Sequence, residues 1–168
     1  MTTDIGTADS AGKSAAWQGY DAMLFDLDGV ITRTVPLHVA AWRRLFDEFL
    51  ADRATLEGGS FEPFDPERDY RIHADGRLRD DGVAAFLESR GIHLTRGTPD
   101  DPPDLPTCCG LGNRKDAYFA EELATQGVQV FADTVQLLDV LHASGKRLAV
   151  VSASENCTAL LDRAGLLD

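Results

Sequence analysis

The stretch MLFDLDGV, residues 23–30, constrains the fold more than any other part of the sequence. Its apolar start is typical of a strand that enters a core, yet Asp26 and Asp28 follow, with Gly29 directly behind them. Burying a carboxylate costs free energy unless the carboxylate is paired or bound to a metal ion. Gly29 permits a tight turn and a close approach of a ligand to the backbone. The pattern therefore predicts a strand over 22–28 that ends at a polar site.

A second apolar run extends from Leu148 to Val151 and ends in Ser152. It lacks the alternation of apolar and polar residues, which is expected of a parallel strand covered on both faces. The roughly 120 residues between the two runs are far more than a crossover connection needs. The sequence therefore predicts an α/β fold with a parallel sheet and a helical insertion between the two strands.

Helical patterns fill most of this interval. Pro36 suits a first helical turn, and apolar residues recur at helical spacing from Leu37 to Phe49. The segment 51–76 contains Gly and Pro breakers and is predicted to be irregular. Later helices are predicted where polar capping residues precede apolar patterns. The predicted starts are Asp80 or Asp81, Asn113, Thr134 and Ser154.

These patterns divide the chain into three kinds of segment. Residues 1–19 are rich in Thr, Ser, Gly and Ala and are predicted to form a flexible N-terminal tail. Residues 20–33 and 128–168 are predicted to form the α/β core. Residues 34–127 are predicted to form the inserted helical cap.

The two strand ends carry the residues suited to chemistry. In open α/β sheets, ligands bind beyond the carboxyl ends of the strands, where Asp26, Asp28 and Ser152 fall. Two carboxylates can act as nucleophile and general acid/base, or they can bind Mg²⁺. Ser154 can cap a helix whose free N–H groups favour an anion. Each feature alone also occurs in ordinary turns and caps, but their combination favours phosphoryl transfer.

The bulk composition excludes some partners and locations. The net charge of −12 disfavours nucleic acid and anionic membranes, because both need basic patches. No apolar run approaches transmembrane length, and the first 19 residues lack the apolar middle of a signal peptide. Cys108, Cys109 and Cys157 show no metal-binding spacing, and their odd number suggests reduced thiols. We therefore expect a cytoplasmic protein.

Four stretches carry a resemblance to a known family. The stretch FDLDGVITRTVPLHVAAWRRL resembles the first motif and cap entry of haloacid-dehalogenase-like phosphatases and phosphomutases, especially the β-phosphoglucomutase branch. The stretch RLAVVSASEN resembles the second motif of that branch, while DGRLRDDGVAAFLESRGI and GLGNRKDAYFAEELATQGV resemble its helical cap. The chain is also similar to actinobacterial members attached to trehalose-phosphatase or glycoside-hydrolase modules. The resemblance implies a Rossmann-like core with an inserted α-helical cap.

The resemblance also implies roles for the residues of the two core motifs. Asp26 would be the nucleophile that forms an aspartyl-phosphate, and Asp28 the acid/base. The Asp26 carboxylate and the Asp28 carbonyl would bind Mg²⁺. Ser152 and the Ala153 backbone would hold the transferring phosphoryl group. The phosphate- and substrate-binding set that the resemblance and the residues together suggest is Gly29, Ser152, Ala153, Ser154, Asn156, His38, Arg79 and Lys115.

Three of these residues belong to the predicted cap. His38 matches a residue near the hinge that contacts the acid/base, Arg79 a substrate-reading arginine, and Lys115 a cap lysine. Asn156, in the core, lies near the distal phosphate site of the branch. His38 could equally be a partly exposed helix residue, and Arg79 and Lys115 could be solvated surface cations.

The sequence departs from the branch in two ways. Glu155 stands where the mutases usually present a lysine that helps to bind a second phosphate, and a carboxylate there repels an anion. The family's third and fourth motifs, a lysine and further acidic metal ligands, lie downstream of the second motif, and no lysine follows Ser152. We therefore expect this chain to be the front part of a longer domain, and to be inactive by itself.

The expected activity of the parent protein is Mg²⁺-dependent hydrolysis of a small phosphorylated metabolite, most simply a sugar phosphate monoester. A β-phosphoglucomutase-type mutase is the first alternative. An inactive fragment or a non-catalytic module of a larger sugar-metabolising protein is the second. Dehalogenation is a third, for which Asp28 and the metal ion would be unnecessary.

Overall fold

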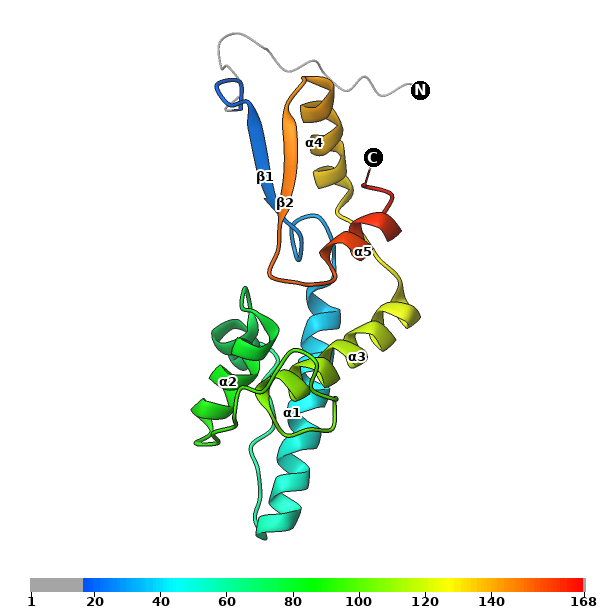
Figure 1. Cartoon of the computed structure of the whole chain (residues 1–168). Helices are drawn as coiled ribbons and strands as arrows, with labels where there is room; N and C mark the ends of the chain where they lie inside the picture. Colours follow the sequence, from blue (N-terminus) through cyan, green and yellow to red (C-terminus); the bar gives the residue numbers. More distant parts are fainter. Residues whose placement is uncertain (1–16, 168) are drawn as a thin grey trace.

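The computed structural model describes residues 17–167, so most of the predicted N-terminal tail lies outside the described residues. Figure 1 places both strands with α4 and α5 at one end of the molecule, and α2 with much of α1 and α3 at the other. The elements in chain order are β1 (Ala22–Asp26), α1 (Val35–Glu57), the π-helical turn η1 (Tyr70–Ala74), α2 (Arg79–Ser89), α3 (Cys108–Gln126), α4 (Ala132–Ala143), β2 (Arg147–Val151) and α5 (Cys157–Arg163).

The two strands are neighbours and run in the same direction. They pair in register from Ala22 opposite Arg147 to Asp26 opposite Val151. All the helices from α1 to α4 lie between them in the sequence. The predicted α/β fold, with a parallel sheet and helices inserted between its strands, is therefore confirmed. The sheet has two strands within the described residues, so the core is incomplete, as predicted.

The unbroken apolar run of the second strand is typical of a strand covered on both faces, but among residues 17–167 one face of the sheet is uncovered. Burial alternates along each strand, and Leu24 and Val151 are 72% and 61% exposed. Phe25 and Val150 point the other way and pack against the buried cluster that includes α5. The face that carries Leu24 and Val151 is therefore apolar but has no covering layer among residues 17–167.

An aromatic core lies at the end of the molecule that contains α2, away from the strands. The ring centroids of Phe46 and Phe86 lie 4.0 Å apart, and Phe64 stacks on Phe46 at 5.4 Å. These rings come from α1, α2 and the connection between them, so they fix the helices against one another. Other buried members of this cluster are Trp42, Leu45, Leu50, Val83, Leu87, Ile92 and Leu111.

A second cluster joins the helices to the strands. It contains Leu27 and Ile31 from the turn after β1, Leu37 from α1, Phe119 from α3 and Leu160 from α5, all buried. Helices α1 and α3 thus contribute to both clusters and connect the two ends of the molecule (Figure 1). The division into core segments 20–33 and 128–168 and a cap over 34–127 stays a prediction.

Several helix limits differ from those predicted. Helix α1 continues to Glu57, because its exposed last turns are good helix formers joined by an Arg53–Glu57 ion pair at 2.8 Å. Helix α3 begins at Cys108, where the Thr107 hydroxyl accepts a hydrogen bond from the Gly110 N–H. Asn113 therefore lies inside α3 and caps nothing. No described helix is long and apolar enough to cross a membrane.

Candidate active site

The paired strands bring the predicted site residues to one edge of the sheet. Asp26 ends β1 opposite Val151 at the end of β2, so Ser152 follows at the same level. Asp26, Asp28 and Ser152 all line one cavity of about 210 Å³. Its opposite wall comes from η1, α2 and α3, so the cavity lies between the strand ends and the helices.

A compact turn after β1 holds Asp28 in place. The Leu27 side chain is fully buried, and its carbonyl accepts hydrogen bonds from the N–H groups of Ile31 and Thr32. Gly29 adopts a φ of 82°, and a Cβ there would lie 3.2 Å from Val35. The left-handed backbone and this contact both favour glycine. Gly29 thus shapes the turn but does not line the cavity.

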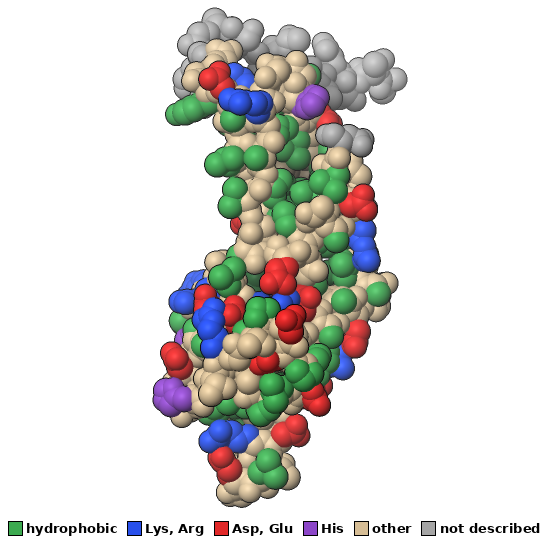
Figure 2. Space-filling view, in the orientation of Figure 1, with side chains coloured by type: hydrophobic (Ala, Val, Ile, Leu, Met, Phe, Trp, Pro, Cys, Tyr) green, Lys and Arg blue, Asp and Glu red, His purple; other side chains and the backbone are tan. Residues whose placement is uncertain are grey.

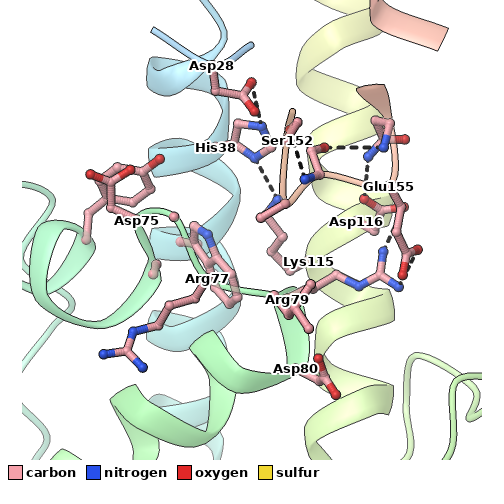
Figure 3. A pocket seen from close by; sticks show the side chains of 18 of the residues that line it. Asp28, His38, Asp75, Arg77, Arg79, Asp80, Lys115, Asp116, Ser152 and Glu155 are labelled. Carbon is pink, nitrogen blue, oxygen red and sulfur yellow. Dashed lines mark hydrogen bonds and ion pairs between the residues drawn. The ribbon is translucent and has the colours of Figure 1, made fainter. Parts of the chain in front are cut away.

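Three side chains form a polar chain across the cavity wall (Figure 3). The buried His38 Nε2 lies 3.3 Å from the Asp28 Oδ1 without the geometry of a hydrogen bond. The His38 Nδ1 lies 2.8 Å from the Lys115 Nζ, and the imidazole stacks on Phe119 at 4.1 Å. An ammonium group can only donate, so Nδ1 accepts and the ring proton sits on Nε2, facing Asp28. The Thr34 hydroxyl also donates to Asp28.

Burial and these contacts set the protonation states. Burial would raise the pKa of Asp28, but His38, Thr34 and the charge of Lys115 outweigh it and lower that pKa below its usual value. Burial lowers the pKa of His38, so the imidazole is neutral at pH 7. Burial also lowers the pKa of Lys115 to about 8. The resting site thus contains a carboxylate, a neutral imidazole and an ammonium ion in sequence.

The loop after β2 forms the second side of the site. The Ser152 hydroxyl accepts a hydrogen bond from the Ser154 N–H at 3.0 Å, and the Ser154 hydroxyl accepts one from the Asn156 N–H at 3.2 Å. The prediction that a helix begins at Ser154 is wrong, because these turns delay α5 until Cys157. Ser152, Ala153, Ser154 and Asn156 nevertheless all line the cavity.

Arg79 is a helix residue, not a surface cation in a loop. It is the first residue of α2, and its guanidinium contacts Asp116, Glu155 and Asn113 at 3.3, 3.0 and 3.0 Å. Gly112 of α3 makes room for its aliphatic part, since a Cβ there would lie 3.1 Å from the Arg79 Cγ. Lys115 is buried, so it is not a solvated surface cation either.

Sequence reasoning missed several residues that line the cavity. Tyr70 and Asp75 come from η1 and its end, where no helical or strand period marks them. Burial raises the pKa of the Tyr70 phenol, and nearby Asp75, Asp28 and Asp26 add to the effect. Asp116 follows Lys115 directly and accepts a hydrogen bond from the Asn156 amide at 2.8 Å. Other missed lining residues are Trp42, Arg77, Asp80, Cys109 and Asn113.

The site offers few ligands for a metal ion. Among residues 17–167, no group of three or more His, Cys, Asp or Glu side chains is placed to hold one. Asp26 and Asp28 nevertheless face the same cavity. Mg²⁺ commonly takes one or two carboxylates and completes its shell with water and phosphate oxygens. The two aspartates fit that partial shell.

Comparison with known proteins identifies related sequences. Residues 20–168 match the family model described as haloacid dehalogenase-like hydrolase. A β-phosphoglucomutase of Mycobacterium tuberculosis is 47% identical over 145 residues, which are 86% of this chain and 55% of that protein. An uncharacterized glycosyl hydrolase of the same species is 34% identical over 149 residues, which are 89% of this chain and 11% of that protein. The chain thus spans about half the length of the mutase relative.

A solved structure has the same fold. A β-phosphoglucomutase from Clostridium difficile matches with a TM-score of 0.62 at 21% identity, covering 88% of this chain and 58% of that structure. Together with the family match, this confirms the resemblance inferred from the motifs around Asp26 and Ser152.

Proposed function

The chain belongs to the haloacid dehalogenase-like hydrolases, and from this premise we propose that it hydrolyses a small phosphate monoester through an aspartyl-phosphate. A sugar phosphate is the proposed substrate, since the mutase relative is 47% identical. The observation that carries the proposal is the convergence of Asp26, Asp28 and Ser152 in one cavity. The proposed setting is the cytoplasm, without nucleic acid or membrane partners.

Asp26 is the proposed nucleophile. It ends β1 with an exposed side chain, and its Oδ1 accepts a hydrogen bond from the Leu27 N–H at 2.8 Å. That contact holds one carboxylate oxygen and leaves the other free to attack phosphorus. Attack forms the bond from aspartate oxygen to phosphorus as the bond from phosphorus to the leaving alcohol breaks.

Asp28 is the proposed acid/base. Asp28 is ionised in the resting site, so it takes up a proton from solvent as substrate binds and passes it to the leaving oxygen in the first step. The carboxylate left behind accepts a proton from water in the second step, which restores the acid for the next cycle. The neutral His38 with its Nε2–H toward Asp28 positions that carboxylate. The ammonium group of Lys115, behind His38, stabilises the ionised form that the second step needs.

The remaining proposed roles concern the anion. The Ser152 hydroxyl and the Ala153 backbone would receive the phosphoryl oxygens, with Ser154, Asn156, Arg79 and Lys115 around the rest of the substrate. Mg²⁺ would be held by the Asp26 carboxylate and the Asp28 carbonyl, and when bound it would neutralise phosphoryl charge. The proposed protein partner of this chain is the rest of the haloacid dehalogenase-like domain.

Two other functions remain candidates, each on a specific observation. The named mutase relatives favour a β-phosphoglucomutase-type reaction, whereas Glu155 opposes it because a mutase must hold a bisphosphate at both ends. The glycosyl hydrolase relative, of which the match covers 11%, favours a non-catalytic module in a larger sugar-metabolising protein. We propose hydrolysis because a carboxylate at the distal end repels the second phosphate.

The proposal predicts the effect of removing each aspartate. In the complete protein, Asp26→Asn should abolish phosphate release and trapping of the site by beryllium fluoride with Mg²⁺. Asp28→Asn should lower turnover by ~10²–10⁴-fold, as expected for a general acid/base. Release of phosphate from β-glucose 1-phosphate, followed by NMR, measures both effects.

Asp52→Asn is the matched control, because Asp52 is an exposed carboxylate on α1 away from the cavity. Undiminished turnover after Asp26→Asn would contradict the assignment. Efficient conversion to glucose 6-phosphate with little free phosphate would favour the mutase instead.

A further inference from the structure

Arg79 is already neutralised by groups of the protein. Its guanidinium lies 3.0 Å from the Glu155 carboxylate and 3.3 Å from that of Asp116, and it donates to the Asn113 amide oxygen at 3.0 Å. Figure 3 shows Glu155 and Asp116 on the side of the cavity toward which the Arg79 guanidinium extends. Two carboxylates on one cation leave no positive charge in excess for an incoming anion.

The two carboxylates come from opposite sides of the cavity. Asp116 belongs to α3, whereas Glu155 belongs to the loop between β2 and α5. The neighbouring Asn156 of that loop donates to Asp116 at 2.8 Å. Glu155 and Asn156 therefore both attach the loop that carries Ser152 to the helices across the cavity.

We infer that Glu155 is a specificity-determining residue that occupies Arg79 as an internal counter-ion and so disfavours substrates with a second anionic group. The inference rests on the proposed function and narrows its substrate class. A substrate would carry one phosphate, at the Asp26 end, and an uncharged hydroxylated remainder. Glu155 thereby takes the place on Arg79 that a distal phosphate would otherwise fill.

The rest of the cavity wall suits such an uncharged remainder. Tyr70 and Asp75 both line the cavity. A phenol and a carboxylate can bind sugar hydroxyls, and a carboxylate disfavours an anion. Arg77 also lines the cavity, but its side chain extends away from Arg79 in Figure 3.

Exposure limits the size of the effect. The Arg79 side chain is 21% exposed but that of Glu155 is 74% exposed, so water and ions reach the pair. Solvated ion pairs are weak, and a strong ligand can displace Glu155. We therefore expect Glu155 to weaken binding of a bisphosphate by about three- to tenfold, and less at high salt.

Binding measurements on the complete protein test this inference. Asp26→Asn is introduced first to prevent phosphoryl transfer, and calorimetry then measures the Kd of glucose 1,6-bisphosphate and glucose 6-phosphate. Adding Glu155→Gln should tighten bisphosphate binding by about three- to tenfold and monophosphate binding by less than about twofold. Adding Arg79→Gln as well should remove the gain. The gain should also shrink in about 0.5 M salt.

Glu88→Gln is the control for net charge, because Glu88 is exposed on α2 and does not line the cavity. Equal tightening of both ligands, no tightening, or no measurable bisphosphate binding to the Glu155→Gln protein would overturn the inference. The outcome is separable from the proposed function, since binding is measured without catalysis. Absence of phosphatase turnover would contradict only the proposed function.

Discussion

Lys115 combines deep burial with a positive charge. Its ammonium group lies 2.8 Å from the His38 Nδ1, and the rings of Phe119 and Trp42 lie 4.9 and 5.3 Å from it. Aromatic faces attract a cation, but they replace little of the water it loses. Burying the Lys115 charge therefore lowers the free energy of unfolding. The neutral imidazole of His38 lies between the ammonium group and Asp28 and transmits the effect of the charge to that carboxylate.

This cost predicts a pH dependence of stability. The pKa of Lys115 falls from the usual 10.5 to about 8, so between these values the unfolded chain binds more protons than the folded one. The contribution of Lys115 to the free energy of unfolding should therefore rise by up to about 3 kcal/mol as pH increases from 8 to 10.5. Urea unfolding of the complete protein and of Lys115→Met, from pH 7 upward, measures this difference.

Lys146→Met is the matched control for loss of a positive charge, because the Lys146 ammonium contacts backbone carbonyls such as that of Tyr20 near the surface. A difference between Lys115→Met and the parent protein that stays constant across this pH range would contradict the prediction. The size of the stability difference at any single pH does not test the prediction, because Lys115→Met also leaves the His38 Nδ1 without its donor. Only the change of that difference with pH does.

At the scale of elements, the first turn of α3 depends on a close backbone contact. A Cβ on Gly110 would clash with the Leu105 carbonyl and lie 2.9 Å from the Pro102 carbonyl. Both carbonyls belong to the loop that crosses the start of α3, and backbone atoms cannot rotate away. Gly110 therefore lets this loop pack onto the helix.

Gly110→Ala should destabilise the protein although alanine is the better helix former. Alanine gains about 1 kcal/mol in a helix, whereas overpacking costs ~1–3 kcal/mol or more against a rigid backbone. We expect a net loss of about 1–2 kcal/mol, measured by urea unfolding. Gly59→Ala is the control, since a Cβ there meets nothing within 4 Å. Equal stability of the two variants would contradict the packing argument.

The same elements show what the sequence could predict. The two strands were predictable, because an apolar run followed by a polar residue is a local signal. The second strand ends at Val151, directly before Ser152, whereas the first was predicted to reach Asp28 and ends at Asp26. The start of α3 was not predictable, because its first residues include Gly110 and Gly112, which weaken a helical pattern and are retained for tertiary contacts. Tyr70 was missed for a similar reason, since a π-helical turn has no period to recognise.

At the scale of the whole molecule, one face of the sheet carries exposed apolar side chains. Leu24 and Val151 lie on the uncovered face, and Figure 2 shows hydrophobic side chains open to solvent over the end of the molecule that holds the strands. Exposed apolar surface binds hydrophobic dyes and promotes aggregation. Each strand also has one edge without a partner among residues 17–167.

The cavity of this 168-residue chain is also short of positive charge. Its lining contains the carboxylates of Asp26, Asp28, Asp75, Asp80, Asp116 and Glu155, against the cations of Arg77, Arg79 and Lys115. Arg79 is already paired with two carboxylates. A phosphate monoester adds further negative charge, and phosphoryl transfer depends mainly on positioning and on stabilising that charge.

We therefore expect residues 1–168 by themselves to bind the dye ANS and to hydrolyse p-nitrophenyl phosphate with Mg²⁺ far more slowly than the complete protein. Dye binding should fall when the uncovered face is made polar by Leu24→Thr with Val151→Thr, because threonine favours strands and presents a hydroxyl in place of apolar surface. Turnover should stay low in that variant, since the charge shortage in the cavity is unchanged. Fluorescence of bound ANS and release of p-nitrophenol measure the two effects separately, with Asp26→Asn as the background for turnover. A sharp thermal transition, no dye binding and Asp26-dependent turnover equal to that of the complete protein would contradict this expectation.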